Sequence, residues 1–156
     1  MVKLMRIDER LIHGQVAFAW TNSLSADCIL VVNDAVAKDK LRATSLKLAA
    51  PAEVKFVVKS VSDAITALNG HKTDKYKLFI LVDNTKDALA LVSAVEEVNH
   101  VNLGNMKVKE GTKVLTNSIA VTEDDINNIK EMVAKGAEVE CRAVPTDKKV
   151  MAETFV

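Results

Sequence analysis

The chain has 156 residues, of which 49% are hydrophobic and 27% charged, a composition typical of a globular domain with a real core. Its 21 basic and 21 acidic residues balance, which argues against a nucleic-acid-binding surface. No hydrophobic run approaches the roughly 20 residues that span a bilayer, and the N-terminus lacks a signal-peptide core. We therefore expect one cytoplasmic domain over residues 1–156, with Cys28 and Cys141 as reduced core thiols.

Short runs rich in Val, Ile and Leu alternate with helical patterns along the chain. The runs that we expect to form strands, with the content of strands buried on both faces, are Val2–Ile7, Cys28–Val32, Val54–Val58, Lys77–Val82, Val98–Leu103 and Val139–Val144. The expected helices between them are Gln15–Leu24, Asp34–Ala50, Val61–Leu68, Lys86–Val95 and Ile126–Ala134. This alternation predicts an α/β fold, with an open, mostly parallel sheet and helices on both faces.

Several residues mark the ends of the expected helices. Asp34 is expected to cap the start of the second helix, and Pro51 helps to end it. Thr122 and Asp125 resemble a capping box, and Gly136 suits the C-terminal end of the last helix.

The stretch 104–119 breaks the alternation of strands and helices. It holds two glycines and two short β-like pieces, Met106–Lys109 and Thr112–Thr116. We expect a small β-hairpin here.

In open α/β sheets, functional sites gather beyond the carboxyl ends of the strands. The most unusual such segment is Arg6–Gln15, RIDERLIHGQ. His13 would lie at or just before the N-terminus of a helix, where free amides and the helix dipole can receive phosphate oxygens. Gly14 would let the backbone approach a ligand closely, and Arg10 could form paired hydrogen bonds to a phosphoryl group.

Histidine suits phosphoryl carrying, because one neutral ring nitrogen is nucleophilic while the other can be held as a donor. Asp8 is a candidate for orienting the ring, or for pairing with Arg6 or Arg10, and the sequence leaves this choice open. A lone histidine near a strand end is more often a helix cap, so spacing alone does not decide its role. His71 and His100 lie in polar connections and are interpreted as surface residues.

Two other functional classes share this fold class. A receiver-like domain would be phosphorylated on Asp34 or Asp83, but the first strand lacks the acidic pair that such domains use to hold magnesium. A binding module would leave His13 without chemistry. Arg42 lies on a charged helix face that is either solvated or docks an acidic partner. Nucleotide-binding loops and zinc-ligand spacings are missing from the sequence, so we expect neither a cofactor nor a metal.

The segment Arg6–Val16, RIDERLIHGQV, closely resembles the active-site loop of IIB components of the mannose/fructose/sorbose family of the bacterial phosphoenolpyruvate-dependent sugar phosphotransferase system. Further matches cover nearly the whole chain and fall at Val32–Ala37, Asn102–Met106, Glu110-Gly111, Ala120–Ile126 and Val144–Thr146. The resemblance implies an open α/β sheet with a small C-terminal hairpin. It also implies that His13 takes a phosphoryl group from a phosphohistidine of a IIA subunit. His13 then passes the group to a sugar entering through the membrane subunits IIC and IID.

The resemblance further implies that Arg10 steadies the phosphoryl group and that Arg42 helps to meet the partner. Asp8, Gly14 and Gln15 complete the expected active site, with Arg6 and Asp34 as support for the phosphate loop. The stretch Asn102–Met106 reads NLGNM, which is similar to members that handle N-acetylgalactosamine or galactosamine. Mannose, fructose, sorbose and N-acetylgalactosamine stay open as sugar classes, as do the phosphorylated ring nitrogen and a homodimer. We expect peripheral association with the membrane transporter.

Overall fold

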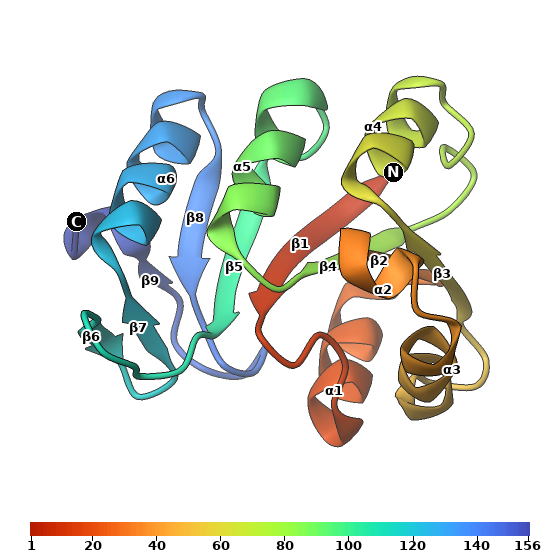
Figure 1. Ribbon diagram of the computed structural model, residues 1–156, viewed down its shortest axis with the longest axis horizontal. Helices are drawn as coiled ribbons and strands as arrows, with labels where there is room; N and C mark the ends of the chain where they lie inside the picture. Colours follow the sequence, from red (N-terminus) through yellow and green to blue (C-terminus); the bar gives the residue numbers. More distant parts are fainter.

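Seven strands form one sheet in the computed structural model, which describes residues 1–156 (Figure 1). The strands are β1 (Val2–Asp8), β2 (Cys28–Val32), β3 (Lys55–Lys59), β4 (Leu78–Val82), β5 (His100–Asn105), β8 (Glu138–Cys141) and β9 (Val150–Met151). Their order is β3-β2-β4-β1-β5-β8-β9, and every neighbouring pair is parallel except β8 and β9. The predicted open parallel sheet is therefore confirmed, and the antiparallel β8–β9 pair agrees with the expected small C-terminal hairpin.

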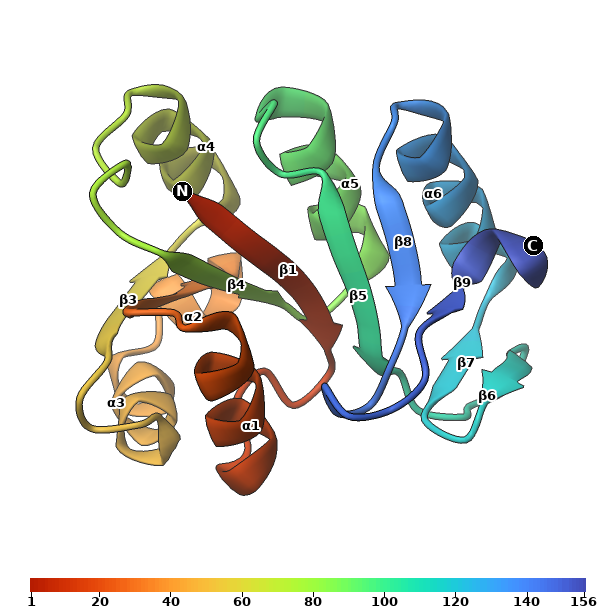
Figure 2. The same cartoon turned by 180° about the vertical axis from the view of Figure 1, so that it is seen from behind.

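Helices cover both faces of this sheet (Figures 1 and 2). They are α1 (Gly14–Leu24), α2 (Asp34–Ala37), α3 (Lys40–Ala49), α4 (Val61–Asn69), α5 (Thr85–Ala94) and α6 (Glu123–Ala134), with a 3₁₀ turn at Ala152–Thr154. One hydrophobic core lies between the sheet and α4, α5 and α6, and a smaller core lies on the other face beneath α1 and α3.

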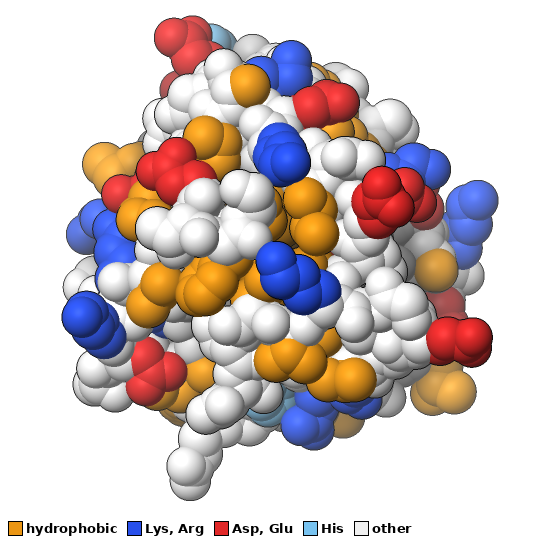
Figure 3. Space-filling model, turned by 90° about the vertical axis from the view of Figure 1, so that its left-hand side faces the viewer, with side chains coloured by type: hydrophobic (Ala, Val, Ile, Leu, Met, Phe, Trp, Pro, Cys, Tyr) orange, Lys and Arg blue, Asp and Glu red, His pale blue; other side chains and the backbone are white.

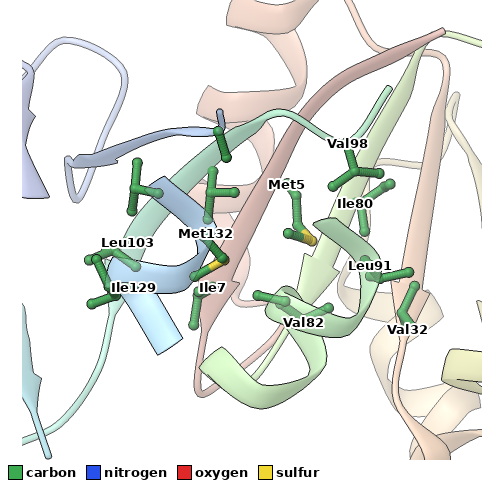
Figure 4. Packing of buried hydrophobic residues seen from close by; sticks show 14 of the residues in the cluster. Met5, Ile7, Val32, Ile80, Val82, Leu91, Val98, Leu103, Ile129 and Met132 are labelled. Atoms are coloured by element: carbon green, nitrogen blue, oxygen red, sulfur yellow. The ribbon is translucent and has the colours of Figure 1, made fainter. Parts of the chain in front are cut away.

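The larger core contains 26 buried residues and is built by alternate positions of the strands (Figure 4). Side chains alternate between the two faces of a strand, so Met5 and Ile7 of β1 enter the larger core while Leu4 enters the smaller one. Arg6 and Asp8 lie on the same side as Leu4, beneath α1. Both cysteines are buried free thiols, as predicted.

Side chains cap the N-termini of five helices, each accepting a hydrogen bond from an amide of the first turn. The capping residues of α2 to α6 are, in order, Asn33, Asp39, Ser60, Asn84 and Thr122. The predicted capping box of Thr122 and Asp125 is present, and Gly136 follows α6 with φ +95°.

The helix predicted over Asp34–Ala50 is in fact two helices. Asp39 has an extended backbone, which ends the first helix. Its carboxylate accepts a hydrogen bond from the amide of Arg42 and so caps the start of α3. The predicted cap at Asp34 is also wrong, because Asn33 caps α2. The Asp34 carboxylate instead accepts a hydrogen bond of 2.8 Å from the amide of Val61, tying α2 to α4.

The hairpin within residues 104–119 has a different pairing from the one predicted. β6 (Lys113–Thr116) pairs with β7 (Ile119–Val121), and Met106–Lys109 is not a strand. Met106 is engaged elsewhere, since its amide donates to the Ser118 carbonyl and its own carbonyl accepts from Ala120. Figure 3 shows the edge of the molecule that carries β6 and β9, where hydrophobic side chains lie exposed between charged ones.

Candidate functional site

The candidate site lies beyond the carboxyl end of β1, which pairs with β4 on one side and β5 on the other (Figure 2). After β1 the chain passes to α1 on one face of the sheet, whereas after β4 it passes to α5 on the opposite face. Connections that diverge to opposite faces leave a crevice at the ends of the strands between them, the usual place for a site in an open α/β sheet.

The loop between β1 and α1 is held from within. The Asp8 carboxylate accepts a hydrogen bond of 2.9 Å from the Arg10 amide, and the Asp8 carbonyl accepts one of 2.9 Å from the Leu11 amide. Leu11 adopts φ +59°, and its side chain is buried with that of Ile12 in the smaller core. These anchors leave the Arg10 side chain exposed without an ion pair and bring His13 to the start of α1.

His13 is the N-cap residue of α1, as predicted, but its side chain does not cap the helix. The first turn of α1 contains no acidic residue either, in contrast to α2, α4, α5 and α6. The free amides at this helix end therefore have no negative or polar side chain to satisfy them, and they can receive an anion.

The two ring nitrogens of His13 have different surroundings. Nε2 is buried and lies 3.4 Å from Oδ2 of Asp8, a distance suited to an ion pair, but the geometry is not that of a hydrogen bond. Nδ1 makes no hydrogen bond and, unlike Nε2, is not shut off from solvent. The side chain is 23% exposed overall. Because Nε2 is buried, only Nδ1 can contact a second molecule.

Asp8 is buried and contacts several members of the loop. Its Oδ2 atom accepts from Nη2 and Nε of Arg6 at 3.1 and 3.3 Å, and its Oδ1 atom accepts from the Asn105 amide group at 3.3 Å. The alternatives left open by the sequence are thus combined: Asp8 pairs with Arg6, holds Arg10 through its backbone, and lies beside His13.

Arg6 is buried beneath α1 and is shared among several acceptors. Its Nη1 atom donates to Oδ1 of Asn102 at 2.8 Å and to the Arg142 carbonyl at 3.1 Å. Its guanidinium lies so close to Gly104 that a Cβ atom there would stand 2.1 Å from Cζ. Burial lowers the pKa of Arg6, while the charges of Asp8 and Glu140 act in the opposite direction.

A second group of charges adjoins Arg6 on β8. Glu140 is 0% exposed, accepts from Nε and Nη2 of Arg142 at 2.8 and 2.7 Å, and accepts from the amide group of Asn102 at 3.3 Å. Burial alone would raise the pKa of Glu140. Hydrogen bonds from His100, Arg142 and Asn102, together with the charge of Arg142, outweigh burial and hold that pKa at about 2.

The only tryptophan of the chain joins these charges to α1. The guanidinium groups of Arg6 and Arg142 lie 5.4 and 5.1 Å from the centre of the Trp20 ring, within the range of cation–π attraction. The indole N–H donates to the Ala143 carbonyl at 3.2 Å. Glu140, Arg142 and Trp20 were not among the predicted site residues, and Asn102 was predicted only as part of the stretch Asn102–Met106 at the end of its strand.

The other predicted site residues lie around this centre or apart from it. Gly14 is exposed with φ +38°, a left-handed conformation that favours glycine. Gln15 is exposed and lines a groove of about 500 Å³ between α1 and Val144–Thr146. Asp34 and Arg42 make no hydrogen bond or ion pair with the loop.

The two remaining histidines differ from each other. His71 is exposed, as predicted, and pairs with Asp74 at 3.0 Å. The surface interpretation of His100 is incomplete, because it begins β5, is only 31% exposed and lies 2.9 Å from Glu138 and 3.3 Å from Glu140.

Groups of three or more His, Cys, Asp or Glu placed to hold a metal ion do not occur, and none of the helices has the length and apolar character needed to cross a membrane.

Known proteins resemble this chain over nearly its whole length. The family described as "PTS system sorbose subfamily IIB component" matches residues 2–156. The chain is 34% identical over 147 residues to the sorbose-specific EIIB component of Lacticaseibacillus casei, covering 94% of this chain and 90% of that one. The IIBSor domain of the sorbose permease from Klebsiella pneumoniae has a similar structure, with a TM-score of 0.91, 32% identity and coverage of 97% and 93%.

A longer relative shows a different organisation. The mannose-specific EIIAB component of Escherichia coli K12 is 38% identical over 150 residues, which is 96% of this chain and 46% of that protein. The chain thus spans about half the length of this relative.

Proposed function

The chain belongs to the sorbose-subfamily IIB components of the sugar phosphotransferase system, and we propose that His13 is its phosphoryl carrier. In this proposal, His13 accepts the group from a phosphohistidine of a IIA subunit and passes it to a sugar at the membrane subunits IIC and IID. The observation that carries the proposal is the placement of His13 at the uncapped N-terminus of α1, with Nε2 facing a buried carboxylate and Nδ1 open to solvent.

Nδ1 is the nucleophile in the proposed transfer. The proton of the neutral ring stays on Nε2, next to Oδ2 of Asp8, so the Nδ1 lone pair is free. This lone pair forms a P–N bond as the P–N bond of the donor breaks and its electron pair returns to the donor's ring. The His13 ring gains positive charge in this step, and the Asp8 carboxylate stabilises it.

Release to the sugar reverses the bonding at Nδ1. A sugar hydroxyl oxygen forms a P–O bond, the P–N bond breaks and Nδ1 regains its lone pair, while the hydroxyl proton passes to a base on the acceptor side. Hexoses and amino sugars of the mannose, fructose, sorbose and N-acetylgalactosamine classes are the proposed acceptors.

Charge neutralisation comes from groups already at the surface. The amides in the first turn of α1, including those of Gly14 and Gln15, have no side-chain cap, so they are available to the phosphoryl oxygens. Arg10 is exposed and free of ion pairs, so its guanidinium can form paired hydrogen bonds to the same oxygens. Positioning and charge are sufficient for transfer from a phosphohistidine, which already holds a reactive P–N bond.

We further propose that α3 contributes to the contact with the IIA subunit. Leu41 and Leu48 are 80% and 83% exposed, whereas the large hydrophobic side chains of a helix usually face the core. The exposed basic residues Lys38, Lys40, Arg42 and Lys47 lie beside them. Paired hydrophobic and basic side chains fit an acidic protein surface with an apolar centre.

A phosphotransfer assay tests the carrier role. Phosphoenolpyruvate, the general relay proteins and a matching IIA subunit are supplied, and the product is read by intact mass and peptide mapping. We expect one acid-labile phosphoryl group on His13, none on His13→Ala, and normal labelling of His71→Ala. Arg10→Ala should be labelled about 10- to 100-fold more slowly, because a charge-assisted pair of hydrogen bonds to the transferred group is lost.

Two results would contradict the proposal. Full labelling of His13→Ala would move the chemistry to another residue. A label that is sensitive to hydroxylamine and dependent on magnesium would identify a phosphoaspartate instead.

A further inference from the structure

We propose that Glu140, on β8, is a positioning residue for His13 and acts through Asn102 and Arg6. The inference rests on the proposed carrier role of His13. It extends the site across three neighbouring strands, from the end of β1 through β5 to β8.

The path from Glu140 to His13 is continuous. Oε2 of Glu140 lies 3.3 Å from the amide nitrogen of Asn102, whose Oδ1 atom lies 2.8 Å from Nη1 of Arg6. Nη2 of Arg6 lies 3.1 Å from Oδ2 of Asp8, and the same oxygen lies 3.4 Å from Nε2 of His13.

The direction of the Asn102 side chain carries the coupling. Its amide nitrogen donates to Glu140 and to the Arg142 carbonyl, and both of these atoms are pure acceptors. The amide oxygen must then face Arg6, which needs an acceptor there. Arg6 held in this way directs its remaining N–H groups at Oδ2 of Asp8, which faces the His13 ring.

Stability alone does not account for this arrangement. Buried ion pairs are weak contributors to folding, and apolar residues of similar volume often serve as well or better. Here the buried set contains Arg6, Asp8, Asn102 and Glu140, with the half-buried Arg142, and it reaches the surface next to His13. A network of fixed hydrogen bonds that ends at a carboxylate 3.4 Å from one imidazole can set the orientation and tautomer of that ring.

Substitution of Glu140 by glutamine tests the role with little change in volume. A glutamine can turn its own N–H₂ group toward Asn102, which allows the Asn102 amide to reverse and present N–H groups to Arg6. Glu138→Gln is the matched control, since Glu138 lies on the same strand and also pairs with His100, but it makes no hydrogen bond or ion pair with Asn102 or Arg142.

The measurements are the ¹⁵N chemical shifts of the His13 ring and the single-turnover rate of transfer from phospho-IIA. In Glu140→Gln we expect a smaller fraction of the tautomer protonated at Nε2, and transfer about two- to thirtyfold slower, the range for residues that act through a packed network. Glu138→Gln should match the wild type in both. A Glu140→Gln protein that is folded, with wild-type ring shifts and rate, would overturn the inference even if its melting temperature falls.

Asn102→Ser provides a second variant if Glu140→Gln does not fold. It interrupts the path while leaving the Glu140–Arg142 pair in place, and unchanged His13 shifts in it would also refute the role of Glu140. The ring shifts need no phosphoryl donor. Absence of labelling in the wild type would therefore count against the carrier proposal, while the tautomer result decides the positioning proposal separately.

Discussion

Gly104→Ala provides a sharp test of the packing beneath His13. General strand propensity predicts that this substitution raises the free energy of unfolding, whereas the structure predicts that it lowers it. Alanine in a strand interior is ordinarily favoured over glycine by about 0.5–1 kcal/mol. At this position, however, the added Cβ would stand 2.1 Å from Cζ and 2.2 Å from Nη1 of Arg6. The guanidinium is buried, so it can yield only by giving up its bonds to Asn102 and Asp8.

Loss of one partner from a buried ion pair costs about 3–5 kcal/mol. After the gain in strand propensity is subtracted, we expect Gly104→Ala to lower the free energy of unfolding by about 2–4 kcal/mol. Urea unfolding followed by Trp20 fluorescence and by circular dichroism measures this change. The fluorescence reports on the site directly, since the ring packs against Arg6.

A double-mutant comparison identifies the cause. In an Arg6→Met background the obstructing guanidinium is absent, so Gly104→Ala should there be close to neutral. A wild-type stability of Gly104→Ala, or an equal loss in both backgrounds, would refute the argument that Gly104 exists to accommodate Arg6.

Two further predictions concern acid stability and docking. The pKa of Glu140 is about 2 in the folded protein against an ordinary value of 4.5. A lowered folded pKa stabilises above pH 4.5, and this stability, on the order of 3 kcal/mol at most, is lost as the pH falls toward 2. Urea unfolding between these pH values should therefore show a steeper decline for the wild type than for Glu140→Gln, and parallel curves would contradict the assignment. Arg42→Glu should raise the KM for phospho-IIA about two- to fivefold with little change in kcat, as expected for a charge at an interface rim. Lys72→Glu, an exposed charge reversal near the amino ends of the strands, is its control, and equal effects would remove α3 from the interface.

The sequence was informative where local signals and the overall fold agree. Strands such as Cys28–Val32 are continuously apolar and buried on both faces, so their pattern is unambiguous. The division between α2 and α3 was missed because Asp39 resembles any exposed helical residue until its carboxylate is seen capping the next helix. The strand predicted over Met106–Lys109 failed because Met106 bonds to Ser118 and Ala120 instead, while Lys109 forms a local turn with Thr112.

The exposed loop residues of the candidate site could be predicted from the sequence, whereas the buried residues beneath them could not. His13, Gly14 and Arg10 follow one another in a single loop, so a linear motif contains them all. Asn102 meets Arg6, and Glu140 meets Asn102, only because β1, β5 and β8 pair in a particular register, which the sequence of one chain does not reveal. A signal for them existed nonetheless: β5, β8 and the part of β1 from Met5 onward alternate apolar and polar residues, as a strand does when one of its faces lacks an apolar cover.

Because the N-terminus of α1 has no side-chain cap, the phosphoryl group of the proposed function would also stabilise the fold of its carrier. A helix cap ordinarily contributes about 1 kcal/mol of stability. The unphosphorylated chain lacks this contribution at α1, whereas α2 to α6 have side-chain caps. A dianion bound at the first turn would satisfy those amides better than any serine or aspartate could. The loaded carrier would then be the better-folded of the two forms, with a stiffer loop to present. Donor and acceptor proteins could distinguish full from empty by that rigidity as well as by charge.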